Sequence, residues 1–170
     1  MGAIAIAIQV VAALLFAQAA WTKLADRAGF EAMVSAWRIA PTWAEAPIAW
    51  VLPPVELVLA AMLLLPFAQP VSAVAAAGLL TVFAASMAIN LMRGRRHIEC
   101  GCGRPGQTIG WGHAARNLAL AALLVAVQAL PAPASLGEAA VGLAGGVVLF
   151  VLDYVLSLIA APRARQGVAA

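Results

Sequence analysis

The chain has 170 residues, of which 65% are hydrophobic and only 10% are charged, and its mean hydropathy is +0.99. A soluble domain of this length cannot hide that much apolar surface, so the composition excludes a soluble globular protein. Basic residues outnumber acidic ones only slightly, ten to seven, and we expect no nucleic-acid partner. We predict one all-α domain over residues 1–170, a polytopic helix bundle integral to the lipid bilayer.

Five apolar segments are each near the ~20 residues that cross a ~30 Å hydrocarbon core. Each should be a helix, because unpaired backbone polar groups cannot face lipid. The fourth is the shortest, and its first turn carries Arg116 and Asn117. Gly142 and Gly146 form a small-xxx-small face in the fifth, which predicts close helix packing. In chain order the predicted transmembrane segments are residues 3–21, 48–67, 71–91, 114–130 and 136–161.

An amphipathic segment at residues 28–39 separates the first two predicted spans. Its apolar residues recur at helical spacing, and polar residues take the opposite face. This pattern predicts a helix lying in the membrane interface with its apolar side down. The helix either caps the bundle or acts as a lid or docking surface beside the cysteine loop described below. The apolar set is Phe30, Met33, Val34 and Trp37, and the polar set is Glu31, Ser35 and Arg38.

Ionisable residues within the predicted spans are few, and each is costly in lipid. Glu56 lies near the middle of the second span, after Pro53 and Pro54. The two prolines free backbone carbonyls and should kink the helix, which would open a polar pocket at that depth. One interpretation is a structural network in which Arg116 pairs with Asp153 or with Glu56. The other is proton handling by Glu56 beside a redox-active thiol pair.

The only two cysteines, Cys100 and Cys102, lie in a short basic loop at residues 92–113. Gly101 between them makes the chain adaptable enough for a disulfide. A disulfide that spans one residue removes little conformational entropy from the unfolded chain, so it would stabilise the fold only weakly. A disulfide that exchanges with other thiols is the better explanation. Glu99 disfavours a thiolate unless it serves as a proton acceptor. The surrounding basic residues favour the thiolate: Arg93, Arg95, Arg96 and Arg104.

The same loop admits a metal site. His97, Cys100 and Cys102 offer one nitrogen and two sulfurs, a set suited to soft or borderline ions. His113 is a candidate fourth ligand. The loop lacks a second cysteine pair, so a closed structural zinc site would be incomplete. Two unreactive thiols are the third interpretation.

The positive charges are distributed unevenly along the chain. If the chain crosses the membrane five times, all ten basic residues fall on one face. The positive-inside rule then places the N-terminus outside, and the C-terminus and the cysteine loop on the cytoplasmic side.

Several short motifs follow one another in an order that is similar to a known family. They are Lys23-Leu24, Pro53-Pro54-Val55-Glu56-Leu57, Asn90, Arg93-Gly94, Glu99-Cys100-Gly101-Cys102-Gly103, Ile109-Gly110-Trp111 and Arg116-Asn117. Over about residues 3–130 the chain resembles MauE, a family of membrane proteins of methylamine utilisation within the broader DoxX-like group. It departs from the family where Gly103-Arg104-Pro105-Gly106 replaces the Phe-Gly that usually follows the cysteines.

The resemblance implies a four-helix DoxX-like core plus a fifth transmembrane helix, in the bacterial inner (cytoplasmic) membrane. It also implies a thiol–disulfide redox protein that exchanges with a thioredoxin-like, MauD-like partner. This exchange would serve the maturation of methylamine dehydrogenase, whose small subunit is rich in disulfides. The plan is similar to that of quinone-coupled thiol oxidoreductases, which makes a membrane quinone a candidate cofactor. Two alternatives remain: a soft-metal binder or permease, and a non-catalytic membrane anchor. The candidate site residues are Cys100, Cys102, Glu99, Glu56 and Arg116.

The implied substrate creates a conflict with the charge count. The dehydrogenase is periplasmic, whereas the positive-inside rule puts the cysteine loop in the cytoplasm. Either the loop is reached from the far side, or reducing equivalents cross the bilayer, or the topology is inverted.

Overall fold

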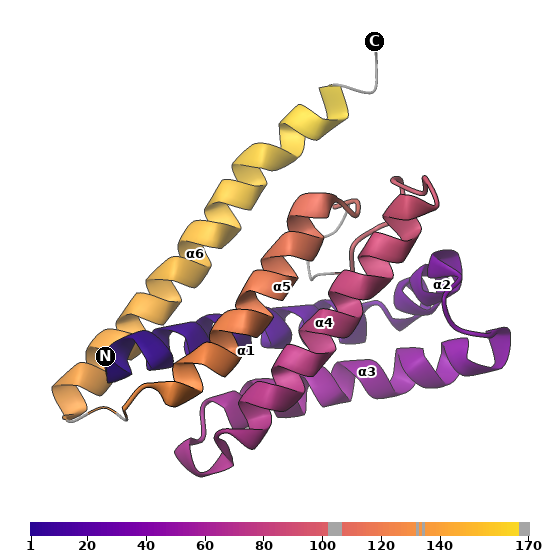
Figure 1. The fold of residues 1–170 in the computed structure, drawn as a ribbon. Helices are drawn as coiled ribbons and strands as arrows, with labels where there is room; N and C mark the ends of the chain where they lie inside the picture. The colour runs from indigo at the N-terminus through magenta and orange to yellow at the C-terminus, as the bar shows by residue number, and fades with distance from the viewer. Residues whose placement is uncertain (102–106, 132, 134, 167–170) are drawn as a thin grey trace.

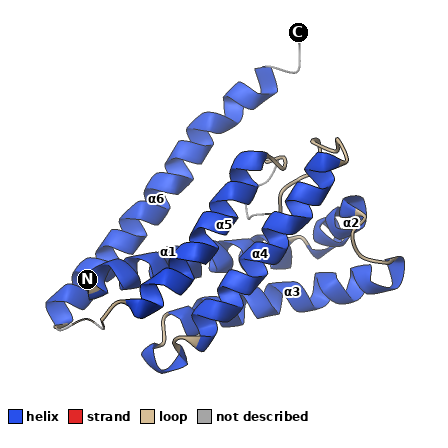
Figure 2. Cartoon of the chain, viewed as in Figure 1, coloured by secondary structure: helices blue, strands red, loops and turns tan. Residues whose placement is uncertain are grey.

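The computed structural model describes residues 1–101, 107–131, 133 and 135–166. These residues form an all-helical bundle, which confirms the predicted fold class, and a lone antiparallel bridge between Glu99 and Thr108 is their only β pairing (Figure 2). The elements are α1 (Gly2–Ala25), α2 (Arg27–Trp37), α3 (Thr42–Leu63), the 3₁₀ turn η1 (Pro66–Ala68), α4 (Val71–Met92), α5 (Trp111–Ala126), the 3₁₀ turn η2 (Val127–Ala129) and α6 (Leu136–Gln166).

Four of these helices are long and apolar enough to cross a membrane: α1, α3, α4 and residues Leu136–Leu158 of α6. The predicted fourth span is also a helix, but α5 has only 16 residues. At 1.5 Å per residue it is about 24 Å long, shorter than the ~30 Å hydrocarbon core. A crossing by α5 therefore stays a prediction.

Several element boundaries differ from the predicted ones. α3 begins at Thr42, six residues before the predicted start, and stays helical through Pro53 and Pro54. It ends at Leu63, because Pro66 opens the 3₁₀ turn that replaces its predicted last turn. The amphipathic segment is the helix α2, whose first turn is capped by the Asp26 carboxylate, 2.9 Å from the Gly29 N–H.

The helices alternate in direction, so that the chain connections gather at two opposite ends of the bundle (Figure 1). α1 packs against α3 and α6, and α4 packs against α5. One end holds the N-terminus, whose ammonium lies 2.9 Å from the Glu138 carboxylate. The other end holds α2 and the cysteine loop, joined by a hydrogen bond from Trp37 Nε1 to the Glu99 carbonyl oxygen. The membrane face that each end occupies stays a prediction.

Small residues let the helices approach closely. The buried centre of the bundle is rich in alanine from α1 and α4, with Phe16 and Leu124 filling the remaining space. Gly142 and Gly146 of α6 face α1, as the small-xxx-small pattern predicts. A Cβ at Gly146 would lie 2.6 Å from the Val10 Cβ, and one at Gly142 would lie 2.7 Å from a backbone oxygen of α1. Only glycine permits this helix pair to pack at its present distance.

Candidate functional site

The cysteine loop is closed at its base by backbone pairing. The Cys100 N–H donates to the Gln107 carbonyl oxygen at 2.7 Å, and the Ile109 N–H donates to the Ile98 carbonyl oxygen at 2.9 Å. Gly101 follows with a φ of +68°, in the left-handed region that favours glycine. The loop therefore leaves α4, forms this short bridge and returns to start α5 at Trp111.

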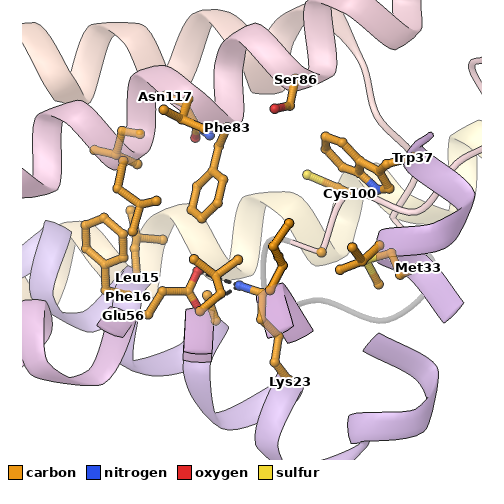
Figure 3. Close-up of a pocket in the computed structure, with 18 of the residues that line it drawn as sticks. Leu15, Phe16, Lys23, Met33, Trp37, Glu56, Phe83, Ser86, Cys100 and Asn117 are labelled. Atoms are coloured by element: carbon orange, nitrogen blue, oxygen red, sulfur yellow. Dashed lines mark hydrogen bonds and ion pairs between the residues drawn. The ribbon is translucent and has the colours of Figure 1, made fainter. Parts of the chain in front are cut away.

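Cys100 lies inside the protein. Its exposed fraction is 5%, it takes part in a disulfide, and its sulfur lies 3.9 Å from the sulfur of Met87 on α4. The sequence has one other cysteine, Cys102, which lies outside the described residues, as does Arg104. Burial places Cys100 on the membrane-bundle side of the loop, next to α4 and α2 (Figure 3).

Glu99 is oriented differently from its neighbour. Its side chain is exposed, while its backbone carbonyl accepts the indole hydrogen bond from Trp37 at 3.1 Å. Successive side chains of an extended segment point to opposite sides, so Glu99 and Cys100 face solvent and interior, respectively. The predicted role of Glu99 as proton acceptor for the thiols stays a prediction.

Two arginines of the loop hold α2 in place. Arg95 donates to the backbone carbonyls of Ala36 and Trp37 at 2.6 and 3.2 Å, and to the Asn90 side chain at 3.0 Å. Arg93 donates at 3.1 Å to the carbonyl of the residue that follows α2. Cations at a helix C-terminus satisfy its last carbonyls and complement its dipole. The sequence predicts only thiol activation for these arginines and gives no sign of this clamp on α2.

A buried ion pair is the main feature that the sequence did not reveal. Lys23 Nζ lies 2.5 and 2.7 Å from the two carboxylate oxygens of Glu56, and the two side chains are 6% and 0% exposed. From the sequence, Lys23 is only one of the ten basic residues in the charge count and part of the Lys23-Leu24 motif. A signal was present, since Lys23 follows Phe16 and Ala19 by seven and four residues and so shares their buried face of α1.

The structure selects Asp153 from the two predicted partners of Arg116. Arg116 lies 3.3 Å from the Asp153 carboxylate, and this half-exposed pair joins α5 to α6. The alternative partner was wrong, because Glu56 is already held by Lys23. Arg116 nevertheless lines the same cavity as Glu56, which is described next.

A cavity of about 340 Å³ lies between α1, α2, α3, α4 and α5. Its walls are mostly apolar, and the few polar groups come from different elements. Figure 3 shows Trp37 beside Cys100 at one side of the cavity, and the Lys23–Glu56 pair with Phe83 at the other. Of the predicted site residues, the cavity thus unites Cys100, Glu56 and Arg116. Its polar lining consists of Lys23, Glu56, Ser86, Cys100, Arg116 and Asn117.

The predicted metal ligands are only partly described. His97 is exposed and Cys100 is buried, while Cys102 lies outside the described residues. Within the described part of the chain, no group of three His, Cys, Asp or Glu side chains is placed to hold a metal ion. The set His97, Cys100 and Cys102 therefore stays a prediction.

Comparisons with known proteins give one consistent result. Residues 1–130 match the family model described as "Methylamine utilisation protein MauE". The chain is 44% identical over 166 residues to methylamine utilization protein MauE of Paracoccus denitrificans, covering 94% of this chain and 89% of that protein. It is 40% identical to the Paracoccus versutus protein of the same name (91% and 86% covered) and 37% to that of Methylophilus methylotrophus (82% and 77%). No solved structure matches.

Proposed function

The chain belongs to the MauE family of methylamine utilisation proteins, and from this premise we propose that it is a membrane thiol–disulfide redox protein. The single observation that carries the proposal is the position of Cys100. This disulfide-bonded residue sits between the cysteine loop and a cavity inside a bundle of membrane-length helices. A disulfide that only stabilises the fold does not need to line a cavity. A disulfide that carries electrons needs access both to a partner on the loop side and to an acceptor on the cavity side.

The exchange itself involves one pair of thiols on each protein. A thiolate of the partner attacks one sulfur of the disulfide, forms a mixed disulfide and releases the other cysteine as a thiolate. The partner's second thiol then attacks the mixed disulfide. The partner leaves with a disulfide, and Cys100 and Cys102 are left as two thiols, so two electrons have passed into the membrane protein.

The burial of Cys100 supports different roles for the two cysteines in the exchange. A folded partner cannot reach a sulfur that is 5% exposed, so we assign the mixed disulfide to Cys102. Cys100 is then the leaving group, which receives the electrons on the cavity side. The proposed partner is a thioredoxin-like, MauD-like protein, and the proposed final substrate is the small subunit of methylamine dehydrogenase.

Trapping the mixed disulfide tests this assignment. The reduced Cys100→Ser and Cys102→Ser variants are mixed with a thioredoxin-like partner whose only cysteine, the attacking one, carries a thionitrobenzoate disulfide. A reactive thiol of the membrane protein then displaces thionitrobenzoate and forms the mixed disulfide, and complexes are separated on non-reducing gels. The Cys100→Ser variant should accumulate the complex and the Cys102→Ser variant should not. Both variants, and the double serine variant, should lose methylamine-dependent growth. Normal growth of the double variant would overturn the redox function and favour a non-catalytic membrane anchor.

We propose a bacterial inner membrane location, and sided thiol labelling tests which face carries the cysteine loop. The charge count predicts the cytoplasmic face, whereas direct exchange toward a periplasmic dehydrogenase requires the periplasmic face. A membrane-impermeant maleimide is applied to intact and to opened cells, before and after mild reduction. Labelling only in opened cells supports the cytoplasmic loop. Labelling of intact cells after reduction places the disulfide on the periplasmic face and inverts the topology.

Soft-metal binding is a second candidate, favoured by the Met87 thioether 3.9 Å from the Cys100 sulfur. Thiolate and thioether sulfurs together select ions such as Cu(I). Equilibrium dialysis of the reduced protein against Cu(I) tests it. Stoichiometric binding that is lost in the Met87→Leu variant supports a metal site, and its absence removes this candidate.

A further inference from the structure

The reduced cysteine pair must give up two electrons and two protons before it can act again. Cys100 faces the cavity, so the acceptor has to reach it there. We infer that this cavity binds the ring of a lipid-soluble quinone, and that Cys100 passes electrons to it. This inference rests on the proposed redox function and specifies its electron acceptor.

The size and walls of the cavity suit a single substituted ring. Its volume of about 340 Å³ lies at the lower end of the ~300–1,000 Å³ range of small-molecule pockets. Phe30, Trp37 and Phe83 line it with aromatic side chains, and aromatic rings favour offset stacking on a flat π-system. A hard metal ion would require several oxygen ligands close together, whereas the polar groups in this cavity are few and separated.

The buried ion pair supplies the polar anchor that a quinone carbonyl needs. An ammonium has three N–H donors, and the two oxygens of Glu56 accept from Lys23 at 2.5 and 2.7 Å. The third donor can bind a carbonyl oxygen. Lys23 Nζ lies 5.4 and 5.5 Å from the ring centres of Phe30 and Phe83, so a carbonyl at this point places the quinone ring among the aromatic walls.

The ion pair also suits the charge that develops during reduction. As the ring accepts electrons, its carbonyl oxygen becomes anionic, and a fixed cation in a dry site stabilises that charge. A buried salt bridge contributes little net stability, so its presence at this position is better explained by such chemistry. Glu56 is placed to exchange a proton with the group that Lys23 binds.

The quinone's isoprenoid tail has a route to the bilayer. α3 and α4 are joined by a short turn and diverge from it toward α2 (Figure 1). Val82 of α4 and Ile39 beyond α2 both line the cavity and are 58% and 42% exposed. The cavity wall therefore reaches the outer surface of the bundle, where a hydrocarbon tail can lie in lipid.

The overall step balances. Cys100 and Cys102 lose two electrons and two protons and re-form their disulfide. The quinone gains the same two electrons and two protons and leaves as the quinol. No other oxidant is required.

Photolabelling of the full chain in lipid nanodiscs tests the site. The probe is a short-tailed azidoquinone, with decylubiquinone as competitor and peptide mass mapping as readout. Leu52→Trp fills the cavity from α3, whereas Leu57→Trp adds the same bulk to the same helix on its exposed face. Ser86→Phe fills the cavity from α4 and serves if Leu52→Trp does not fold.

We expect competed labelling of peptides from α1, α3 or α4 at one probe per chain. Each cavity-filling variant should weaken labelling by at least about tenfold, because the added side chain occupies space that the quinone ring needs. A tenfold loss corresponds to about 1.4 kcal/mol of binding free energy. The Leu57→Trp variant should stay within about twofold, as surface substitutions do. Labelling that is not competed, that maps elsewhere or that is unchanged by both fillings overturns the inference.

Thiol exchange separates this inference from the proposed function. The oxidised cavity-filled variants should still accept electrons from a reduced thioredoxin-like partner at the wild-type rate in a single turnover. If wild-type protein exchanges thiols but binds no quinone, only the present inference fails. If wild-type protein does not exchange thiols, the proposed function fails, whatever the labelling shows.

Discussion

Replacing Lys23 with methionine removes one partner of a fully buried ion pair while keeping the bulk of the side chain. Glu56 is 0% exposed and both its oxygens bind Lys23, so the variant leaves an unpaired carboxylate in a buried position. Breaking a buried pair from one side costs about 3–5 kcal/mol. We expect Lys23→Met to lower the free energy of unfolding by that amount, measured by SDS titration in mixed micelles.

The double variant Lys23→Met with Glu56→Gln removes both charges and should recover most of the loss, because neutral groups cost less to bury. Arg116→Met is the matched control. Its partner Asp153 lies 3.3 Å away, and the two side chains are 31% and 37% exposed, so this loss should stay within about 1 kcal/mol. Equal losses in Lys23→Met and Arg116→Met would refute the reasoning, since they would mean that burial does not distinguish the two pairs.

Three further predictions concern glycines and the arginine clamp. Gly101→Ala should destabilise the protein more than Gly94→Ala in the same titration. Both glycines have positive φ, but only at position 101 would the added Cβ lie 2.8 Å from the sulfur of Met33 on α2. Gly146→Val should separate α6 from α1, seen as loss of a cysteine crosslink engineered between the two helices, and an unchanged crosslink would contradict the packing. Arg95→Met should free the end of α2 and speed proteolysis there, while Arg96→Met should not; equal cleavage would argue against the clamp.

Hydropathy was sufficient to predict the helices, because each apolar segment must satisfy its backbone internally whatever its neighbours are. The end of α3 was misplaced, since Leu64 and Leu65 continue the apolar run and only Pro66 signals the 3₁₀ turn. The small-xxx-small face of α6 was recognised because its spacing is local to one helix.

The site depended on contacts between distant elements, which a single sequence does not specify. Charge counting treats Lys23 as a residue at the end of a span, and its partner Glu56 is 33 residues away on another helix. Arg116 had two acidic candidates, and only the packing of α5 on α6 selects Asp153. The cavity has no local signature, because five helices and the cysteine loop each contribute part of its wall.

The attachment of α2 to the cysteine loop couples two movements. Trp37 donates to the loop backbone at Glu99, Arg95 from the loop grips the last turn of α2, and Met33 lies against Gly101. These contacts tie α2 to the described part of the loop, and both line the cavity. In the exchange that we propose, we therefore expect a partner that draws the loop outward to displace α2 with it, so that docking of the partner also changes access to the cavity.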